Sequence, residues 1–306
     1  MEKLRGKTAF VTGGASGLGF AIAKAASDAG MNIIIADLRR NILDEAVKKF
    51  KDLGVDAYGI ELNVVDREAY ARAAEEAVSK FGNIHLLCNN AGIGCARGRL
   101  WEVSAEDTDM AMDVNMRGVL NGIQAILPGM IAHGEGGHVV NTSSKNGLLP
   151  PATLGLYNMT KGAVVCLTET LAAELPEGYG ASVFCPGPFQ TTLGQTSIEV
   201  PALLRGETPV PVPPRQPMAV DEEWGFDPEE SRSRTMPAEV AGKLVIRGIR
   251  RGDLYIITHS EFYEGVKARY DAVLRAFPKD PPSEAFKRAA AFLTYNPVFA
   301  LQREYK

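Results

Sequence analysis

Short apolar runs alternate with longer segments of helical periodicity over the first 190 residues of the chain. Runs such as NIIIAD and IHLLCN are almost continuously apolar, which is typical of parallel strands that are covered by helices on both faces. The alternation itself indicates β-α-β units. The predicted strands span residues 7–12, 31–37, 56–62, 84–89, 138–143, 181–185 and 254–258. The pattern therefore predicts an α/β protein with a doubly wound, parallel, seven-stranded sheet.

Residues 191–236 interrupt this alternation. Residues 201–228 contain seven of the eighteen prolines and few periodic apolar positions, so we expect a structureless insertion. In a compact protein, insertions of this length are usually either functional lids or disordered segments. Apolar anchors favour a substrate lid. These anchors are Leu203, Leu204, Trp224 and Phe226.

The segment after the last predicted strand has helical character again. Residues 261–277 and 283–294 are predicted helices, and the pair Pro281 and Pro282 separates them. Residues 259–306 are thus expected to form a helical C-terminal extension. No internal repeat divides the chain, so we expect one domain over residues 1–306.

Charge and composition narrow the range of partners. The formal net charge is −4, and no stretch is dense in lysine or arginine, which argues against nucleic acid as a partner. The amino-terminal sequence MEKLRGKTAFVTGG reaches glycines before an apolar stretch of signal-peptide length, and no window has about 18 consecutive apolar residues. We therefore expect a cytoplasmic protein without a membrane partner.

The cysteines and histidines have no spacing that is typical of a disulfide framework or a metal site. The cysteines form no C-x-x-C pair and mostly lie in apolar surroundings, which favours reduced, buried thiols. The histidines have no i, i+4 pairing, so no metal ligands are expected. The residues are Cys88, Cys95, Cys166 and Cys185, and His85, His133, His138 and His259.

A glycine-rich turn follows the first predicted strand. Its sequence is TGGASGLG, from Thr12 to Gly19, and an alanine-rich helical segment comes directly after it. Strand, glycine turn and helix in this order bring backbone N–H groups and the positive end of a helix to one point, which suits a pyrophosphate. The sequence predicts a Rossmann-like dinucleotide site here.

The second predicted strand ends at Asp37, where a carboxylate can accept hydrogen bonds from the adenosine ribose. The same carboxylate would repel the 2′-phosphate of NADP, so NAD is the favoured cofactor and NADP the alternative. Arg39 and Arg40 leave this choice open, because they either recruit a phosphate or are solvated charges before the next helix.

Three further residues suggest chemistry. Tyr157 and Lys161 stand four residues apart in a helical segment, which places them on one face. Ser144 follows the strand HVVNTS, at the carboxyl edge of the sheet, where doubly wound folds bind ligands.

Taken together, these motifs resemble the short-chain dehydrogenase/reductase family. Six signals follow the order of that family: T-G-x-x-x-G-x-G at 12–19, N-N-A-G at 89–92, V-N-x-x-G around Asn115, Ser144, Y-x-x-x-K from Tyr157 to Lys161, and P-G-x-x-x-T at 186–191. The resemblance implies that Tyr157 is the acid/base, that Ser144 positions the substrate oxygen, that Lys161 binds the nicotinamide ribose and Tyr157, and that Asn115 anchors a proton-relay water.

The resemblance also implies the cofactor contacts. One departure is Asn63, where the family often has aspartate against the adenine amino group; its amide carbonyl can accept the same bond. The residues expected to line the cofactor are Gly13, Ser16, Gly17, Leu18, Gly19, Asp37, Leu38, Asn63, Val64, Asn90, Ala91, Gly92, Tyr157, Lys161, Pro186, Gly187, Phe189 and Thr191.

Elementary electrostatics supports the role of Tyr157. A free tyrosine, with a pKa of about 10, is a poor base at neutral pH. One ammonium at about 4 Å supplies roughly 4 kcal/mol at an effective dielectric constant of about 20, enough to lower that pKa by two to three units. Lys161 is expected to be this ammonium. Tyr157 would then exchange a proton with the substrate oxygen while hydride moves to or from the carbinol carbon.

The expected reaction interconverts a secondary alcohol and a ketone. An apolar or aromatic small-molecule substrate is favoured by the side chains Leu148, Leu149, Phe189, Leu193, Trp224 and Phe226. A narrower resemblance, carried by DREAYARAAEEAV, YIITHSEF and the helical tail, is to bacterial dehydrogenases that oxidise the benzylic carbinol of lignin-derived aryl ethers. Two other readings stay open: a non-redox epimerase or dehydratase of the extended family, and a non-catalytic NAD-binding sensor.

The family resemblance further implies a homodimer or homotetramer. Its contact would involve two long helices around residues 110–132 and 157–175, where small residues permit close packing. The helical tail could instead cap this surface.

Overall fold

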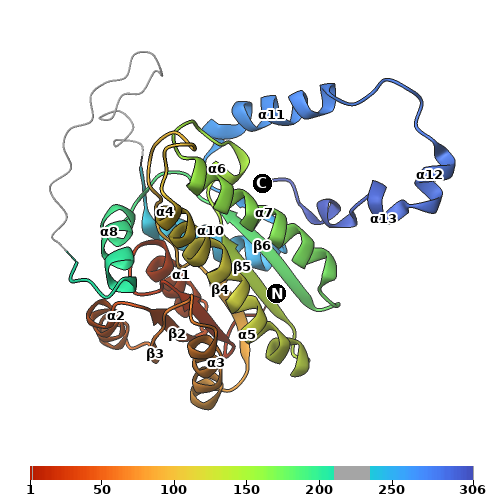
Figure 1. The fold of residues 1–306 in the computed structure, drawn as a ribbon. Coiled ribbons are helices and arrows are strands. Elements are labelled where there is room, and N and C mark those ends of the chain that lie inside the picture. Colours follow the sequence, from red (N-terminus) through yellow and green to blue (C-terminus); the bar gives the residue numbers. More distant parts are fainter. Residues whose placement is uncertain (2, 210–234, 306) are drawn as a thin grey trace.

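Each apolar run forms a strand of one parallel sheet (Figure 1). The computed structural model describes residues 1, 3–209 and 235–305. The strands are β1 (Thr8–Thr12), β2 (Asn32–Asp37), β3 (Ala57–Glu61), β4 (Ile84–Asn89), β5 (Gly137–Thr142), β6 (Tyr179–Cys185) and β9 (Tyr255–Ile257). Their order is β3-β2-β1-β4-β5-β6-β9, and every neighbouring pair is parallel. The predicted doubly wound sheet is confirmed.

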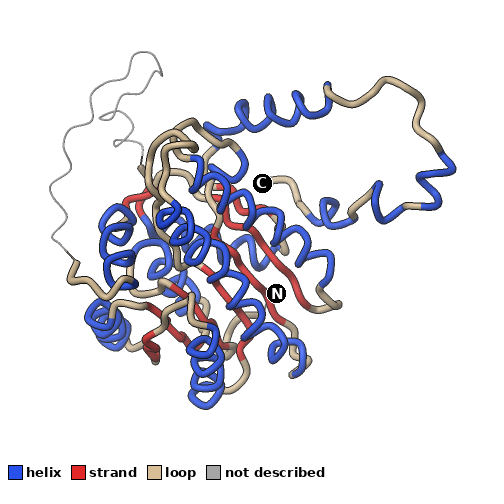
Figure 2. The backbone as a smooth tube through the Cα atoms, viewed as in Figure 1, coloured by secondary structure: helices blue, strands red, loops and turns tan. Residues whose placement is uncertain are grey.

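Helices cover both faces of the sheet (Figure 2). One face is covered by α1 (Gly17–Asp28), α2 (Arg40–Asp52) and α10 (Ala238–Arg251). The other is covered by α3 (Arg67–Phe81), α5 (Gly118–Ala132) and α7 (Gly155–Glu174). Three shorter helical segments lie between β4 and α7 in the chain. They are α4 (Ala105–Met112), the π-helical turn η1 (Asp113–Arg117) and α6 (Lys145–Leu148).

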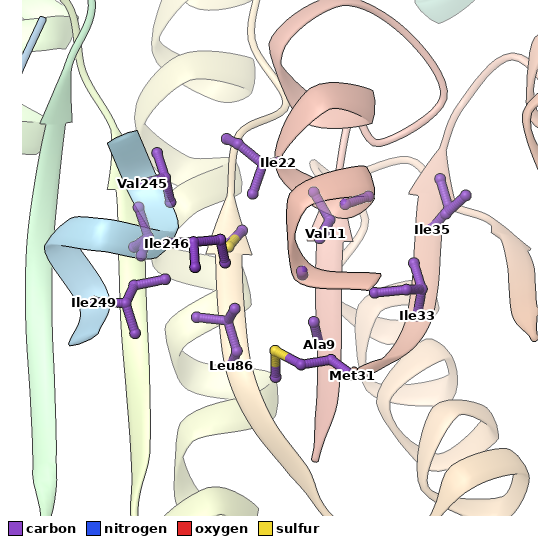
Figure 3. Close-up of a cluster of buried hydrophobic side chains, with 14 of the residues drawn as sticks. Ala9, Val11, Ile22, Met31, Ile33, Ile35, Leu86, Val245, Ile246 and Ile249 are labelled. Carbon is purple, nitrogen blue, oxygen red and sulfur yellow. The ribbon is translucent and has the colours of Figure 1, made fainter. Parts of the chain in front are cut away.

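The two faces are built from alternate residues of each strand. In β1, Val11 belongs to the cluster under α1 and α10, whereas Phe10 belongs to the cluster under α3 and α5. Figure 3 shows the first cluster, in which Ile33 of β2 and Leu86 of β4 lie in one apolar layer with Val245 of α10. Because both faces are buried, neither face of the strand needs polar residues, which explains the continuous apolar runs.

Helix ends follow local residue chemistry. Asp66 caps α3 by accepting a hydrogen bond from the Ala69 N–H (2.8 Å), and Gly82 ends the same helix with φ of +76°. Ser104 caps α4 by accepting from the Asp107 N–H (3.0 Å). These caps fix where the two helices begin.

The expectation of a structureless insertion is wrong for its first part. Leu193–Leu204 form a helix, α8, and Val200 and Leu204 pack against the cluster under α3 and α5. This packing depends on residues distant in sequence, so local periodicity did not reveal it. Two short strands, β7 (Phe189–Gln190) and β8 (Met236–Pro237), pair at the base of the insertion. Trp224 and Phe226 lie outside the described residues.

The C-terminal segment leaves the body of the protein as a helical arm (Figure 1). The turn η2 (Ser260–Phe262) leads into α11 (Tyr263–Arg275), and α12 (Glu284–Ala289) and α13 (Ala291–Thr294) follow in place of the single predicted helix 283–294. The turn η3 (Pro297–Leu301) returns to contact α7, and Val298 is buried there. Across the described part of the chain, the helices are too short or too polar to span a membrane.

Close packing of α1 on α10 yields a stability prediction. A Cβ atom added at Gly242 would lie 2.1 Å from the Ala21 carbonyl oxygen, which is backbone and has no alternative rotamer. We expect Gly242→Ala to lower the free energy of unfolding by about 1–3 kcal/mol. Urea unfolding measures this, with Lys243→Ala, an exposed neighbour on the same helix, as the control. Equal stability of the two variants would contradict the packing described.

Candidate active site

The sequence motifs meet at the carboxyl ends of the central strands. The side-chain amide of Asn90, after β4, donates to the carbonyl oxygens of Thr12 (3.2 Å) and Gly13 (3.4 Å), at the end of β1. The Lys145 N–H, after β5, donates to the Pro186 carbonyl, after β6 (2.9 Å). Since β1 and β4 are neighbours whose crossovers run in opposite directions, this edge is the position where doubly wound sheets bind ligands.

The glycine turn is shaped to receive an anion. Gly13 and Gly17 have φ of +60° and +53°, and a Cβ at Gly19 would lie 2.1 Å from the Gly13 carbonyl oxygen. Ser16 is the N-cap residue of α1, yet its side chain accepts no hydrogen bond from the helix. The first N–H groups of α1 thus lack a side-chain cap, and the helix dipole adds positive potential there.

Asp37 lies at the end of β2, as the sequence predicted, but its carboxylate is bound by Arg39. The Arg39 guanidinium donates to both carboxylate oxygens of Asp37 (Nε–Oδ1 3.1 Å, Nη2–Oδ2 3.2 Å) and to the Ser16 hydroxyl (2.9 Å). It also pairs with Glu199 of α8 (3.5 Å). Arg39 is buried, so its reading as a solvated charge is wrong; Arg40 does carry an exposed charge and pairs with Asp44.

The expected adenine side of the pocket follows β3. The side-chain oxygen Oδ1 of Asn63 accepts a hydrogen bond from the Val65 N–H (3.1 Å), which fixes the turn after the strand. Val64 is buried against α5, where a Cβ at Gly118 would lie 2.8 Å from its methyl group. Asn63 therefore shapes this turn, and one lone pair of its side-chain oxygen is already used.

Ser144, Tyr157 and Lys161 are brought together, as their spacing predicted. The Lys161 Nζ donates to the Thr142 carbonyl oxygen (3.1 Å) and lies 5.6 Å from the centre of the Tyr157 ring. The Ser144 hydroxyl lies close enough to Tyr157 to lower the pKa of the phenol. A Cβ at Gly92 would lie 3.4 Å from the Lys161 Nζ, so the ammonium also borders the turn after β4. The site thus combines a phenol, a hydroxyl and a buried amine.

The pKa of Tyr157 differs from the expectation. Burial of its hydroxyl raises the pKa of Tyr157 to about 12, and the nearby Ser144 hydroxyl offsets part of this rise. Burial also lowers the pKa of Lys161 to about 8. The predicted lowering of the tyrosine pKa by Lys161 is therefore wrong for this structure, because both groups are removed from water and Lys161 directs its Nζ at the Thr142 carbonyl.

Asn115 lies in the π-helical turn η1, a feature that is frequent at functional sites. Its side chain accepts from the Ile93 N–H (2.8 Å) and donates to the Ile93 carbonyl oxygen (2.9 Å). The amide thus holds the turn after β4 against the helix. In this structure both atoms of the Asn115 side-chain amide are hydrogen-bonded to protein groups.

Sequence reasoning missed Cys95. Its sulfur lies 3.6 Å from the Asn115 side-chain nitrogen, which places the thiol beside the site. Burial raises the pKa of Cys95 to about 11, so the thiol stays neutral at physiological pH. All four cysteines are free, but Cys95 is partly exposed and Cys166 is exposed, which corrects the expectation of buried thiols. No local signal marked Cys95.

A cluster of possible metal ligands lies at the opposite end of the sheet. Ligand atoms of His85, His133 and Glu135 lie within 4.8 Å of one another. The Nδ1 atoms of His85 and His133 accept from the N–H groups of Thr8 (3.2 Å) and Glu135 (3.1 Å). These bonds use the imidazole lone pairs that a metal needs, while the opposite nitrogens contact Glu135 and the Ile84 carbonyl. The cluster is accounted for by hydrogen bonding.

Comparison with known proteins identifies the family. The sequence model described as short chain dehydrogenase matches residues 7–200. The chain belongs to the short-chain dehydrogenase family. It is 33% identical to a C alpha-dehydrogenase of Sphingobium sp. strain SYK-6, with 97% of this chain and 95% of that relative covered. Membership makes it an oxidoreductase of the alcohol dehydrogenase and ketoreductase class.

Solved structures agree with this assignment. A short-chain dehydrogenase/reductase from Burkholderia phymatum, in complex with NAD, is 32% identical and superposes with a TM-score of 0.77 over 92% of this chain and all of that chain. The apo form of LigO from Sphingobium sp. strain SYK-6 is 33% identical, with a TM-score of 0.72 over 96% of this chain and 97% of that one. The resemblance to the family and its lignin-related members is confirmed.

The buried ammonium yields a pH-dependent stability prediction. The pKa of Lys161 is lowered from 10.5 to about 8, so the unfolded chain binds this proton more tightly than the folded one. Below pH 8 this costs on the order of 3 kcal/mol of stability; the cost shrinks as pH rises and vanishes above about pH 10.5. We expect Lys161→Met to gain stability relative to the native chain at pH 7 and to lose that gain by pH 10.5.

Urea unfolding of both proteins across this pH range measures the difference in free energy of unfolding. Lys48→Met, which removes an exposed lysine on α2, is the matched control and should show no such pH dependence. A pH-independent difference for Lys161→Met would show that Lys161 is not held as a destabilised buried charge.

Proposed function

We propose that this protein is an NAD-dependent enzyme that interconverts a secondary alcohol and a ketone, with Tyr157 as the acid/base. The observation that carries the proposal is the buried constellation of Ser144, Tyr157 and Lys161 beside the glycine turn. A protein that only binds a nucleotide has no physical need of a phenol, a hydroxyl and an amine at this position.

The residues present fit a dinucleotide. The uncapped start of α1 and the close approach at Gly19 suit the pyrophosphate, and Asp37 suits the adenosine ribose. Lys161, bordering Gly92, suits the ribose of the nicotinamide. When bound, the nicotinamide supplies or accepts the hydride.

The roles of the side chains follow from their protonation. In reduction, the neutral Tyr157 hydroxyl donates a proton to the substrate oxygen, while the Ser144 hydroxyl donates a hydrogen bond to the same oxygen. The protonated Lys161 stabilises the phenolate that remains. In oxidation the same groups act in reverse, and Tyr157 must first lose its proton. The high pKa of Tyr157 in the free protein keeps the phenol protonated, and this favours its role as the proton donor in reduction.

The choice of NAD over NADP depends on Asp37. Its carboxylate can accept from ribose hydroxyls and repels a 2′-phosphate, which supports NAD, as does the NAD complex of the Burkholderia relative. For this contact, the Arg39 guanidinium must release at least part of Asp37.

An aromatic substrate with a benzylic carbinol is the favoured class. The relative named C alpha-dehydrogenase supports it. Leu148 is buried, Leu149 lies against Gly265 of α11, and Phe189 packs against the apolar cluster under α1 and α10. The part of residues 191–236 that is described, with α8 carrying Ser197 to the Gly94 N–H (2.6 Å), is consistent with the proposed lid.

A homodimer or homotetramer is proposed through α5 and α7. The α5 sequence, GVLNGIQAILPGMIA, has no charged residue although the helix lies on the outside of the sheet. Leu120 and Ile131 of α5 and Met159 of α7 are exposed. Burying these side chains against a second copy removes apolar surface from water.

Replacing the acid/base tests the mechanism. We expect Tyr157→Phe to lower turnover of 1-phenylethanol with NAD by about 100-fold or more, because proton transfer is lost, while the protein still binds NADH. Initial rates of NADH formation at 340 nm measure turnover, and fluorescence titration measures binding. Tyr58→Phe, which removes an exposed hydroxyl bonded to Glu76, is the control.

Rates of Tyr157→Phe near those of the native protein would contradict the assignment. Accumulation of free NADH in proportion to alcohol consumed would separate the proposed reaction from that of an epimerase or dehydratase, which retains its nucleotide. Tight NADH binding without turnover of any secondary alcohol would favour a sensor.

The cofactor preference has its own test. We expect Asp37→Ala to shift the ratio of kcat/KM for NAD to that for NADP by about 10- to 100-fold toward NADP, because one charge-assisted contact to ribose is lost and Arg39 is freed. Asp44→Ala, which removes an exposed carboxylate on α2, should leave the ratio unchanged. An unshifted ratio in Asp37→Ala would show that this carboxylate does not select the cofactor.

A further inference from the structure

Lys145 is a half-buried cation directly beside the proposed active site. It follows Ser144 in sequence, and its backbone N–H donates to the Pro186 carbonyl oxygen (2.9 Å). This bond ties the residue to the segment 186–191, which is expected to lie against the nicotinamide. The position of Lys145 is thus fixed between two walls of the site.

The ammonium of Lys145 lies over an aromatic ring of the C-terminal segment. Its Nζ is 5.4 Å from the centre of the Phe262 ring. The same ring lies against Gly187, where an added Cβ would be 2.7 Å from the Phe262 Cε2. Lys145, Phe262 and Gly187 therefore form one continuous wall, which joins the end of β5 to the turn after β6.

Within the described part of the chain, no acidic side chain forms an ion pair with Lys145. The Lys145 Nζ makes no hydrogen bond or ion pair there, and its contact with Phe262 is to the face of a ring. Burial alone lowers the pKa of Lys145, without a contribution from any carboxylate. The face of an aromatic ring attracts a lysine ammonium but provides no oxygen to accept its N–H groups. The ammonium of Lys145 therefore keeps unused hydrogen-bond donors.

A second cation near this wall, Arg269, is already engaged. Arg269 of α11 donates to the carbonyl oxygens of Gly147 (3.2 Å) and Leu148 (2.6 Å). Lys145 is thus a single point charge rather than part of a fork. A single ammonium suits a monovalent anion, whereas phosphate groups are more often met by an arginine fork or several donors.

We propose that Lys145 binds a carboxylate on the substrate, remote from the carbinol carbon. This inference rests on the proposed function, since it assigns one end of the same substrate. The substrate class is then an aryl or alkyl secondary alcohol, or its ketone, that carries a carboxylate. The apolar wall holds the body of the molecule, and Lys145 selects its charged end.

Binding of matched ketones to the NADH-loaded protein tests the proposal. The probes are 4-acetylbenzoate and 3-acetylbenzoate, each compared by isothermal titration with its neutral amide, 4-acetylbenzamide or 3-acetylbenzamide. We expect at least one carboxylate to bind about 10-fold or more tightly than its amide, as a charge-assisted hydrogen bond implies. Lys145→Met should remove this preference, and Lys48→Met should keep it.

Three outcomes are informative. Equal affinities of carboxylate and amide for the native protein, for both isomers, would overturn the proposal, as would a preference that survives in Lys145→Met. Should Lys145→Met not fold, Lys145→Gln supplies the same comparison. A carboxylate preference without NADH formation from the corresponding alcohols would retain the Lys145 site and reject the proposed reaction, so the two failures are distinguishable.

Discussion

The parallel direction of all strands is the constraint on which the site depends. Because every strand of the described sheet ends at the same edge, the segments after β1, β4, β5 and β6 meet there although up to about 180 residues separate them in sequence. Asn90, which binds the carbonyl oxygens at the end of β1, shows how directly these segments contact one another. The helices on both faces support this edge by burying the central strands β1, β4 and β5 along their whole length.

Charge burial is the recurring feature of this edge. Lys161 is held away from water with a carbonyl oxygen as its partner, and Arg39 neutralises Asp37 beneath the glycine turn. Each arrangement opposes solvation, and each lies where a charged or dipolar ligand would be received. Such groups commonly mark functional sites, because the free energy lost on folding is recovered when a complementary group binds or forms. Lys145, half-buried over Phe262, follows the same logic.

The predictions from sequence succeeded where a residue acts through local spacing. The strand at NIIIAD, the glycine turn and the four-residue separation of Tyr157 and Lys161 all appear as expected. They failed where distant packing decides. Helix α8 forms inside a proline-rich insertion because Val200 and Leu204 find an apolar cluster, and Arg39 is buried because α8 supplies Glu199. Cys95 likewise lies beside the site because Asn115 binds the turn that carries it.

The amino-acid sequence alone determined the order of strands and helices, the phosphate-binding turn and the identity of the candidate chemical groups. These follow from periodicity, glycine conformation and residue type, which are local properties. Only the tertiary structure decided how water is excluded from those groups. It raises the pKa of Tyr157, lowers that of Lys161 and directs Arg39 onto Asp37. Desolvation and ion pairing depend on every atom that surrounds a group, and most of those atoms come from distant parts of the chain.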